Sequence, residues 1–468
     1  MLPPRWRHVF MLASLVLLTM LANACDCVWM AQGYAWLDEN RNGVQDEGEP
    51  PLEGVMFLID DVRNNYQRVG ERSISNAEGK ADLGVFIAGC PATDFEVYAV
   101  APPGLEHTTP ARLAAGQERN DEGKDVFLFG FAYAPGVTPT PKPTPTPMRC
   151  HTFTVPYIDT FYGRDFIAFA QDGTGWIISN MHSRRLLALA PDGTVTEISR
   201  EQDPLGEVNA HVLAADDHGN LWVGTSMGLS QFQPQTGHWT SFTQEDGLTG
   251  SDIQDIATLG GHVLVKTTAG IESLSPTGKW QLLLAQEKLP SNGLEKFIEV
   301  DNEVVYLTND YLLRFWLTAQ GNIQWEWLWH REKRPIPITS IWNGDMATTA
   351  TLWMGGSNNT KEDILASWDL HSWEMTLHTF QSTGGVLGKD WITNVVAESD
   401  DRVWVGVGNE LIRGVPMEAG SEAMAWIVYD ARTLHVPTLE DIGHLAISPD
   451  KALWIRTTYQ WVRCPLPD

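Results

Sequence analysis

The residues whose types and spacing could do chemistry lie in the stretch DENRNGVQDEGE, residues 38–49. Acidic and amide side chains recur at alternate positions before Gly43, and a glutamate closes the stretch, which matches the calcium-loop pattern D-x-[DN]-x-[DN]-G-x5-E throughout. Calcium takes roughly six to eight hard oxygen ligands, and a glycine lets the backbone turn sharply enough for the preceding side chains to converge. The predicted ligands are Asp38, Asn40, Asn42, the Val44 carbonyl, Asp46 directly or through water, and both carboxylate oxygens of Glu49.

The segments on both sides of this loop alternate apolar and polar residues, as β-strands do. A bound metal would therefore fix a connection between strands and could not open a pair of helices. Magnesium would need stricter octahedral geometry and would keep more water, so the pattern favours calcium as a structural ion. A solvated acidic turn without metal is the alternative.

The thirteen histidines form no comparable pattern. The sequence has no H-E-x-x-H motif, no pair of histidines at metal-ligand spacing and no G-x-S-x-G elbow. No catalytic residue is predicted, and calcium is the only predicted cofactor. The following histidines are interpreted as ordinary loop or strand-edge residues: His107, His218, His262, His371 and His378.

Length and charge limit the possible folds and partners. A chain of 468 residues with 43% apolar content predicts two or more domains with buried cores. Its 32 basic and 59 acidic residues give a formal charge of −27, which repels phosphate backbones and anionic membrane surfaces. Nucleic acid is therefore not an expected partner, whereas cations, sugars and basic protein surfaces remain open.

The N-terminus is typical of an export signal, predicted to span residues 1–24. Arg5 and Arg7 precede an apolar run over residues 10–21, which is too short for a comfortable membrane span. Cleavage after the following Ala-Asn-Ala would expose Cys25, and this segment resembles the signal of bacterial lipoproteins, which implies a lipid anchor on Cys25. Ala22 stands where those proteins usually carry Leu, so plain secretion is the alternative.

Five cysteines in an exported chain predict two disulfide bonds and one cysteine with another fate. The simplest assignment leaves Cys25 as the unpaired residue. The expected pairs are then Cys27 with Cys90 in the first domain, and Cys150 with Cys464 in the second.

A proline-rich segment separates the two expected domains. Residues 135–149 contain TPTPKPTPTP, which favours extended polyproline II and predicts a stalk. Residues 25–134 before it predict a small β-sandwich, because short alternating segments are separated by turn signals. These segments are 33–37, 54–59, 81–87, 94–100 and 125–131.

Residues 150–468 repeat one unit, clearest at DDHGNLWVGTSMGLSQF, residues 216–232. Each unit alternates strands with Asp/Gly turns, and the repeat period of roughly 40 to 50 residues predicts seven four-stranded units, a seven-bladed β-propeller. The predicted fold class is thus all-β, an N-terminal β-sandwich followed by this propeller. The central bulky positions of the units are Trp176, Trp222, Leu264, Tyr306, Trp353, Trp404 and Trp454.

The last unit has only three strands of its own, LAIS, ALWIRTT and QWVRCP. The segment CHTFTV, residues 150–155, follows the stalk and is free to supply the fourth strand, beside the strand that carries Cys464. A bond between Cys150 and Cys464 would then lock the ring.

Most of the 20 tryptophans are expected to be structural, because a ring on the central strand of a unit packs between neighbouring units. Trp325, Trp327 and Trp329 alternate along one segment and would share one strand face. Together with Trp316 they would form either a core between blades or a platform for a ligand.

The second domain resembles a known repeat. LWVGTSMGL, with D-x-x-G before it and DGL after it, resembles the two-component-regulator propeller repeat, and RVWVGVGNEL is a second good match. VLVKTTAGI and VVYLTNDYL match only the general pattern of this repeat. In that family the propeller is often the extracellular sensor of a histidine kinase; with no kinase domain in this sequence, a direct signalling role is not expected.

The first domain, residues 27–134, resembles the calcium-binding B-type repeats of bacterial surface adhesins of the Sdr type, relatives of the Cna B domains. GYAWLDENRNGVQDEGEPPLEGVMFLID, SNAEGKADLGVFIAG and FEVYAVAPPGLEHT carry the resemblance. It implies a sandwich stabilised by calcium.

We expect an exported, cell-surface or secreted, non-catalytic binding protein whose sandwich and stalk present the propeller to an extracellular glycan, peptide or protein. The alternative is a propeller enzyme, a lyase or hydrolase acting on a glycan or macrocycle. His, Asp and Glu side chains that converge on the propeller axis with shifted pKa values would favour the enzyme. An axis lined by backbone, Trp and Ser/Thr would favour binding.

Overall fold

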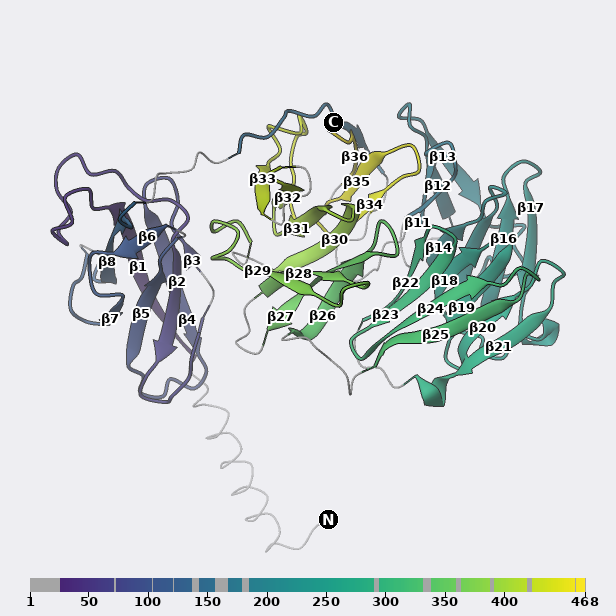
Figure 1. Ribbon diagram of the computed structural model, residues 1–468, viewed down its shortest axis with the longest axis horizontal. Helices are drawn as coiled ribbons and strands as arrows, with labels where there is room; N and C mark the ends of the chain where they lie inside the picture. The colour runs from purple at the N-terminus through teal and green to yellow at the C-terminus, as the bar shows by residue number, and fades with distance from the viewer. Residues whose placement is uncertain are drawn as a thin grey trace, which may run out of the picture. The chain divides into compact units, whose positions relative to one another are not determined.

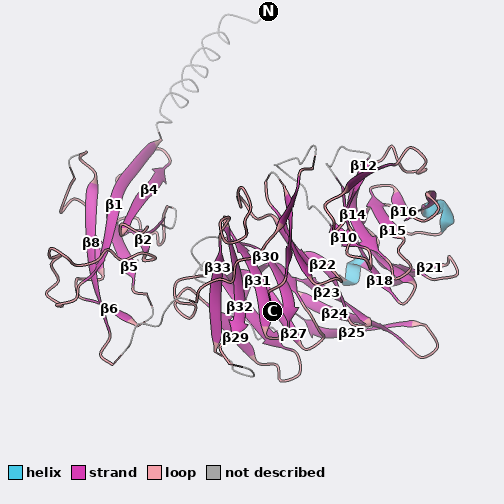
Figure 2. Cartoon of the chain, turned by 90° about the horizontal axis from the view of Figure 1, so that it is seen from above, coloured by secondary structure: helices cyan, strands magenta, loops and turns pink. Residues whose placement is uncertain are grey.

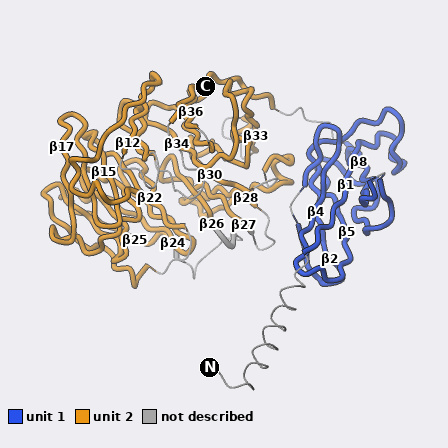
Figure 3. The backbone as a smooth tube through the Cα atoms, turned by 180° about the vertical axis from the view of Figure 1, so that it is seen from behind, with its two compact units in different colours: residues 1–141 blue, residues 142–468 orange. Residues whose placement is uncertain are grey.

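The described chain forms two compact units, unit 1 (residues 1–141) and unit 2 (residues 142–468), coloured blue and orange in Figure 3. The expected signal segment 1–24 and Cys25 lie outside the described residues. The computed structural model describes residues 26–70, 73–102, 104–120, 122–136, 143–155, 167–178, 185–289, 294–330, 338–358, 363–387, 391–418, 423–458 and 460–467.

Strands make up almost all of the regular structure (Figure 2). The helices in the described residues are two single turns, η1 (Gln244–Asp246) and η2 (Gln286–Lys288). Neither is long and apolar enough to cross a membrane. The protein is all-β, as the sequence predicts.

The described part of unit 1 forms two four-stranded sheets. Side chains alternate between the two faces of each strand, so every second residue can enter the space between the sheets. One sheet contains, in spatial order, β4 (Lys80–Ile87), β1 (Cys27–Leu37), β8 (Asp125–Tyr133) and β6 (Leu105–His107). The other contains β3 (Ser73–Ile74), β2 (Met56–Asp61), β5 (Phe95–Val100) and β7 (Arg112–Ala114).

The two sheets of unit 1 share one hydrophobic core. Phe57 from one sheet and Phe129 from the other are fully buried, with ring centroids 5.7 Å apart. Burial of such rings contributes on the order of 2 to 3 kcal/mol each. The expected bond between Cys27 and Cys90 is present, with a Cα–Cα distance of 5.3 Å, and it ties the start of β1 to the loop after β4.

The described part of unit 2 contains seven four-stranded antiparallel sheets, the arrangement of a β-propeller (Figure 1). The first four sheets are β10 (Ile167–Phe169) to β13 (Val195–Ser199), β14 (Ala210–Ala215) to β17 (His238–Phe242), β18 (Ile253–Leu259) to β21 (Trp280–Ala285), and β22 (Glu295–Val300) to β25 (Ile323–His330). The others are β26 (Ile338–Asp345) to β29 (Met375–His378), β30 (Ile392–Ser399) to β33 (Met424–Tyr429), and β34 (His444–Ile447) to β36 (Trp461–Pro465) with β9 (His151–Phe153).

The bulky residue expected at the centre of each repeat lies on the second strand of its sheet. All seven of these residues are buried, with at most 7% of their surface exposed. The ring of Trp176 in the first sheet lies 6.2 Å from Phe232 in the second, and Trp454 in the seventh sheet lies 5.7 Å from Phe169 in the first. Large rings on the central strands thus pack neighbouring sheets together.

The seventh sheet is completed by a strand from the other end of unit 2. β9 pairs antiparallel with β36 through Phe153 opposite Trp461 and His151 opposite Arg463. Cys150 and Cys464 form a disulfide bond beside this pairing, with a Cα–Cα distance of 4.2 Å. The residues that follow the stalk therefore join the end of the chain, as expected from the missing fourth strand.

The two disulfide bonds point to an oxidising compartment, because cytosolic thiols are kept reduced. The protein is accordingly an exported one.

Loss of the second disulfide should destabilise unit 2 alone. Cys150→Ser/Cys464→Ser frees a loop whose ends are 314 residues apart, and we expect a loss of about 2 to 5 kcal/mol in the free energy of unfolding of unit 2. Denaturant unfolding, followed separately for each unit, measures it. Cys27→Ser/Cys90→Ser is the control and should change only unit 1; an unchanged midpoint for unit 2 in the first variant would contradict the role of the bond.

Candidate functional site

Unit 2 contains a cavity of about 530 Å³ lined by the first strand of every sheet. The first strands are the inner strands of the seven sheets, so the cavity lies where the sheets meet around the centre of the unit. The residues of the lining include Ala168, Ala214, Ile256, Phe297, Asp345, Val396 and Ala446, one from each sheet in chain order.

Carboxylates in this cavity bond to the backbone of neighbouring sheets. Asp255 on β18 accepts a hydrogen bond from the backbone N–H of Phe297 on β22, at 2.6 Å. In the reverse direction, Glu299 on β22 accepts from the N–H of Thr258 on β18, at 2.5 Å. The first strand of a sheet has an inner edge that its own sheet cannot pair, and these carboxylates satisfy its donors.

Two further side chains extend the pattern to the next sheets. Asp345 on β26 accepts from the N–H of Ala397 on β30, at 3.0 Å. Lys296 on β22 donates from Nζ to the carbonyl of Gly344 on β26, at 3.1 Å. Polar side chains thus connect the third to the sixth sheet around the cavity.

The titratable groups of the cavity have shifted pKa values. Burial raises the pKa of Glu299 to about 7, with the nearby Asp217 and Asp255 charges adding to the effect and the bonds from Thr258 opposing it. Burial also raises the pKa of Asp345, against the attraction of Lys296. For His444, burial first and then the charges of Lys296 and Arg456 lower the pKa to about 3. At neutral pH His444 is neutral and Glu299 is partly protonated.

This lining answers the question that the sequence left open. His, Asp and Glu side chains with shifted pKa values do converge here, which is the outcome that would favour an enzyme over the alternative lining of backbone, Trp and Ser/Thr. The carboxylates are engaged with backbone N–H groups, which is a structural role. The cavity can accept hydrogen bonds from a polar ligand, and it contains groups that could exchange protons near neutral pH.

No sequence motif marked these residues, because they come from strands far apart in the chain. One signal was present in IQDIATL, where the buried Asp255 lies inside an otherwise apolar strand.

The predicted calcium loop lies in unit 1 between β1 and β2. Asp38 is fully buried and accepts hydrogen bonds from the backbone N–H groups of Asn42 and Gly43, at 3.1 and 2.7 Å. Glu49 accepts from the N–H groups of Glu39 and Asp46, both at 3.0 Å, and so draws the end of the loop onto its start. Gly43 has a φ of 75°, the left-handed conformation that the tight turn requires.

The other expected ligands converge on one carboxylate. The side-chain amides of Asn40 and Asn42 both donate to Oδ2 of Asp46, at 2.7 and 2.6 Å. In this arrangement the amide N–H groups of both asparagines face the carboxylate of Asp46. A bound cation would attract the amide oxygens to the same place instead. The donor set of oxygen atoms fits calcium.

Carboxylates alone would not make this site. The described residues contain no group of three or more His, Cys, Asp or Glu side chains placed to hold a metal. Half of the predicted ligand set consists of amide and carbonyl oxygens, from Asn40, Asn42 and Val44. A site here depends on those neutral oxygens.

The tryptophans of β25 do not share one strand face. The pairing of β25 with β24 (Tyr311–Leu317) shifts register between Trp327 and Trp329, so Leu328 is the extra residue of a β-bulge. Trp329 is buried toward the fifth sheet, 6.0 Å from the ring of Trp368. Trp325 packs instead on the core shared with the third sheet, and Trp327 is 37% exposed.

The expectation that all three rings share one strand face is therefore wrong for Trp329, because the bulge places it opposite to Trp325 and Trp327, whose rings lie 6.2 Å apart. Trp316 lies on the neighbouring β24, with the guanidinium of Arg314 5.6 Å from its ring centroid. These rings are mainly structural, as the alternative interpretation had it.

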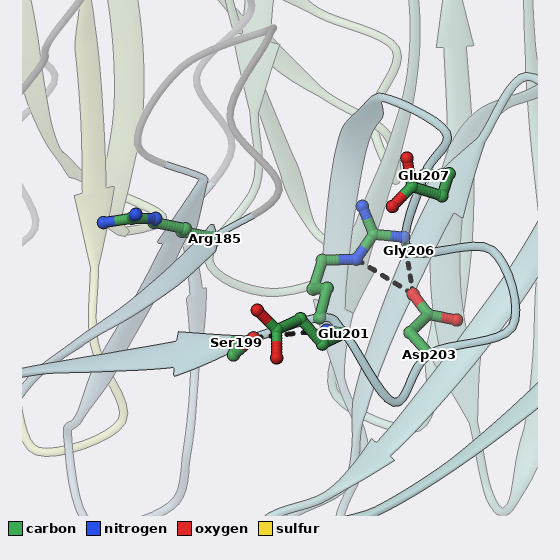
Figure 4. A pocket seen from close by; sticks show the side chains of 7 residues that line it. Arg185, Ser199, Glu201, Asp203, Gly206 and Glu207 are labelled. Atoms are coloured by element: carbon green, nitrogen blue, oxygen red, sulfur yellow. Dashed lines mark hydrogen bonds and ion pairs between the residues drawn. The ribbon is translucent and has the colours of Figure 1, made fainter.

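A second pocket, of about 280 Å³, lies beside the loop from β13 to β14. Figure 4 shows Arg185 on one side of it and Asp203 and Glu207 on the other. Arg200 is fully buried and donates to Asp203 at 2.5 Å and to the carbonyls of Leu205 and Val208 at 3.0 Å each. These bonds stabilise the conformation of the loop. We interpret the pocket as a consequence of that conformation and not as a binding site.

Two of the histidines interpreted as ordinary are structural. His378 is buried, stacks on Trp353 at 5.6 Å and lies 3.1 Å from the hydroxyl of Ser367. Burial lowers its pKa to about 4. His107 packs against Phe131, and burial lowers its pKa as well.

Comparison with known proteins finds only distant structural similarity. No family model and no curated protein sequence matches the chain. A streptogramin B lyase structure aligns with a TM-score of 0.48 and 12% identity, over 69% of this chain and 98% of that one. YCF48 bound to D1 peptide aligns with a TM-score of 0.49 and 15% identity, over 70% and 99%.

An extracellular domain of a one component system from B. thetaiotaomicron aligns with a TM-score of 0.46 and 15% identity, over 67% of this chain and 40% of that one. These similarities concern the arrangement of sheets. They are too distant to assign an activity.

The stability of unit 2 should depend on the charge of Glu299. Because its folded-state pKa is raised above the ordinary value of 4.5 to about 7, the folded state keeps a proton that the unfolded state has released in this window. The free energy of unfolding should therefore fall as the pH rises from the ordinary value of 4.5 to about 7. The glutamine of Glu299→Gln cannot ionise. The free energy of unfolding of this variant should therefore fall less between pH 5 and pH 8 than that of the wild type.

Denaturant unfolding at the two pH values measures the effect. Glu287→Gln, at an exposed carboxylate on η2 outside the cavity, is the matched control and should follow the wild type. Parallel pH profiles for Glu299→Gln and the wild type would contradict the shifted pKa.

Proposed function

We propose that this chain is an exported binding protein in which the seven sheets of unit 2 form a seven-bladed propeller that holds an extracellular ligand in its central cavity. The observation that carries the proposal is the cavity of about 530 Å³ to which every first strand contributes. Its volume lies within the range of small-ligand sites, roughly 300 to 1,000 Å³. The lining combines apolar residues with a few polar groups that can orient a ligand.

The polar groups favour a ligand rich in hydrogen-bond donors. Asp255, Glu299 and Asp345 supply carboxylate oxygens, with Lys296 the cation that reaches among them. Hydroxyl or amine groups of a glycan, or basic side chains of a peptide or protein, suit such a lining. Nucleic acid does not, because the chain carries a formal charge of −27.

Unit 1 is proposed to be a base for the propeller, a β-sandwich of the Sdr B type. Calcium held by Asp38, Asn40, Asn42, the Val44 carbonyl, Asp46 and Glu49 would fix the connection from β1 to β2. The stalk, residues 135–149, would carry the propeller outward. A lipid on Cys25 would hold the protein at the cell envelope, and secretion without lipid is the alternative.

A second candidate function is catalysis, a lyase or hydrolase reaction on a glycan or macrocycle. The specific observation in its favour is Glu299, whose pKa of about 7 would let it act as a general acid or base. His444 and Asp345 line the same cavity. Binding remains the first choice because the carboxylates already serve the backbone of neighbouring sheets.

A ligand screen tests the binding proposal. The exported chain, residues 25–468, is applied to glycan and peptide arrays, and retention is measured together with any loss of the probe. Ala347→Trp fills the cavity and should reduce retention at least tenfold, whereas Ala319→Trp, at an exposed turn, should not. Equal retention by both variants would place the binding site elsewhere.

The same screen separates the two functions. Conversion of a retained probe to a product, slowed by Glu299→Gln, would establish the enzyme. Retention with unchanged probe supports binding alone.

Calcium should stabilise unit 1. An ion that binds only the folded state adds about 2.7 kcal/mol at a hundredfold excess over Kd, so the thermal midpoint of unit 1 should rise in calcium relative to chelator. Asp46→Asn/Glu49→Gln should lose this shift. Glu53→Gln, an exposed residue before β2 that is not a predicted ligand, should retain it. The same midpoint with and without calcium would leave the loop as an acidic turn.

A further inference from the structure

The outer face of the β1–β4 pair in unit 1 changes character along its length. At one end the cross-strand pairs are polar, Tyr34 with Lys80 and Gln32 with Asp82. The side-chain amide of Gln32 donates to Asp82 at 3.4 Å. This end is an ordinary solvated sheet surface.

The other end of the same face is apolar and exposed. Val28 pairs with Phe86, and Met30 pairs with Gly84, on the face opposite to the core. The exposed fractions are 62% for Val28, 51% for Met30 and 66% for Phe86. Gly84 adds no side chain, and the space above it is open. Three large apolar side chains thus form one exposed surface, here called the apolar end.

Exposure of this kind requires a reason. The alternating residues Trp29, Ala31 and Val85 point to the other face and pack in or against the core, so the strands did not lack apolar residues for the interior. Cross-strand neighbours of this kind form a continuous surface, and exposed continuous apolar surfaces mark contact with a partner or a membrane.

The position of the apolar end in the chain indicates the partner. β1 starts at Cys27, so only Asp26 and Cys27 lie between Cys25 and Val28, which is three steps along the chain. A chain of three residues spans at most about 10 Å. The disulfide between Cys27 and Cys90 ties the loop after Phe86 to the same end. A lipid attached to Cys25 would therefore hold the bilayer surface next to the apolar end and away from the polar end.

We propose that Val28, Met30 and Phe86 rest in the surface of the lipid bilayer to which Cys25 is anchored. An apolar protein contact beside a lipid anchor adds to the membrane affinity and sets the orientation of the anchored domain. The partner is a neutral, zwitterionic surface, because an anionic one would repel a chain of formal charge −27. The proposal builds on the lipid anchor suggested above, and its test separates the two.

The exported chain, residues 25–468, is coupled through the Cys25 thiol to a maleimide lipid in phosphatidylcholine vesicles that contain a photoactivatable phospholipid. Cross-linked residues are then mapped by mass spectrometry. We expect cross-links concentrated on residues 27–31 and 84–88. Val28→Ser/Met30→Ser/Phe86→Ser should reduce them at least fivefold, whereas Met227→Ser, at a residue 58% exposed in unit 2, should not.

Cross-links spread evenly over unit 1, or unchanged in the triple variant, would overturn the proposal. So would a concentration-dependent dimer of the untethered chain that Phe86→Ser abolishes, which would assign the apolar end to a second copy. The tether replaces the natural lipid, so the outcome does not depend on native lipidation. The intact mass of the exported protein tests that question separately, by the presence or absence of acyl chains on Cys25.

Discussion

Each sheet of unit 2 has an inner edge that no strand can pair, and this constraint shapes the centre of the unit. An outer edge can be hydrated, but the inner edges crowd around one cavity. A buried backbone N–H without a partner costs about 1 to 3 kcal/mol. The buried N–H of Phe297 avoids that cost because Asp255 from a neighbouring sheet accepts it. The less buried N–H groups of Thr258 and Ala397 are satisfied in the same way by Glu299 and Asp345. Polar atoms at the centre are thus a requirement of the fold.

The same requirement produces the electrostatics of the candidate site. The protein that surrounds the cavity raises the pKa of Glu299 to about 7 by desolvation, and the nearby charges of Asp217 and Asp255 add a smaller effect. A shifted pKa in a cavity is therefore no sufficient sign of catalysis here, because backbone pairing already explains why the group is present. This is why binding is preferred over an enzyme, although the same group could be used for proton transfer.

Much of the fold could be predicted because its signals are local. The turns and bulky central residues recur at a nearly constant period, and the last repeat visibly lacked one strand, so the pairing of β9 with β36 and the Cys150–Cys464 bond could be inferred. The short strands β3, β6 and β7 could not, since two or three residues carry no periodicity. The register of β25 was also beyond the sequence, because a single bulge at Leu328 moves Trp329 to the other face.

The cavity residues were missed for a different reason. Asp255, Lys296, Asp345 and His444 come from four different sheets, and only closure of the ring brings them together. No spacing within one segment could show this. The calcium loop lies at the other extreme, since all its expected ligands fall within twelve consecutive positions, and a pattern of residue types is enough to propose it.

The inner residues of the cavity are constrained in a way that bears on ligand choice. Replacement of Asp255, Glu299 or Asp345 by an apolar residue would leave a backbone N–H without its acceptor, so these positions cannot vary freely to suit a ligand. Gln171, Asp217 and Lys451 line the same cavity from the turns between first and second strands. The seven turns of this kind differ in length and charge, as SPDK, DDHGN and MATTA illustrate. If the cavity binds a ligand as proposed, selectivity would reside in these turns, where the sequence can change at little cost to the ring, and the inner carboxylates would stay constant.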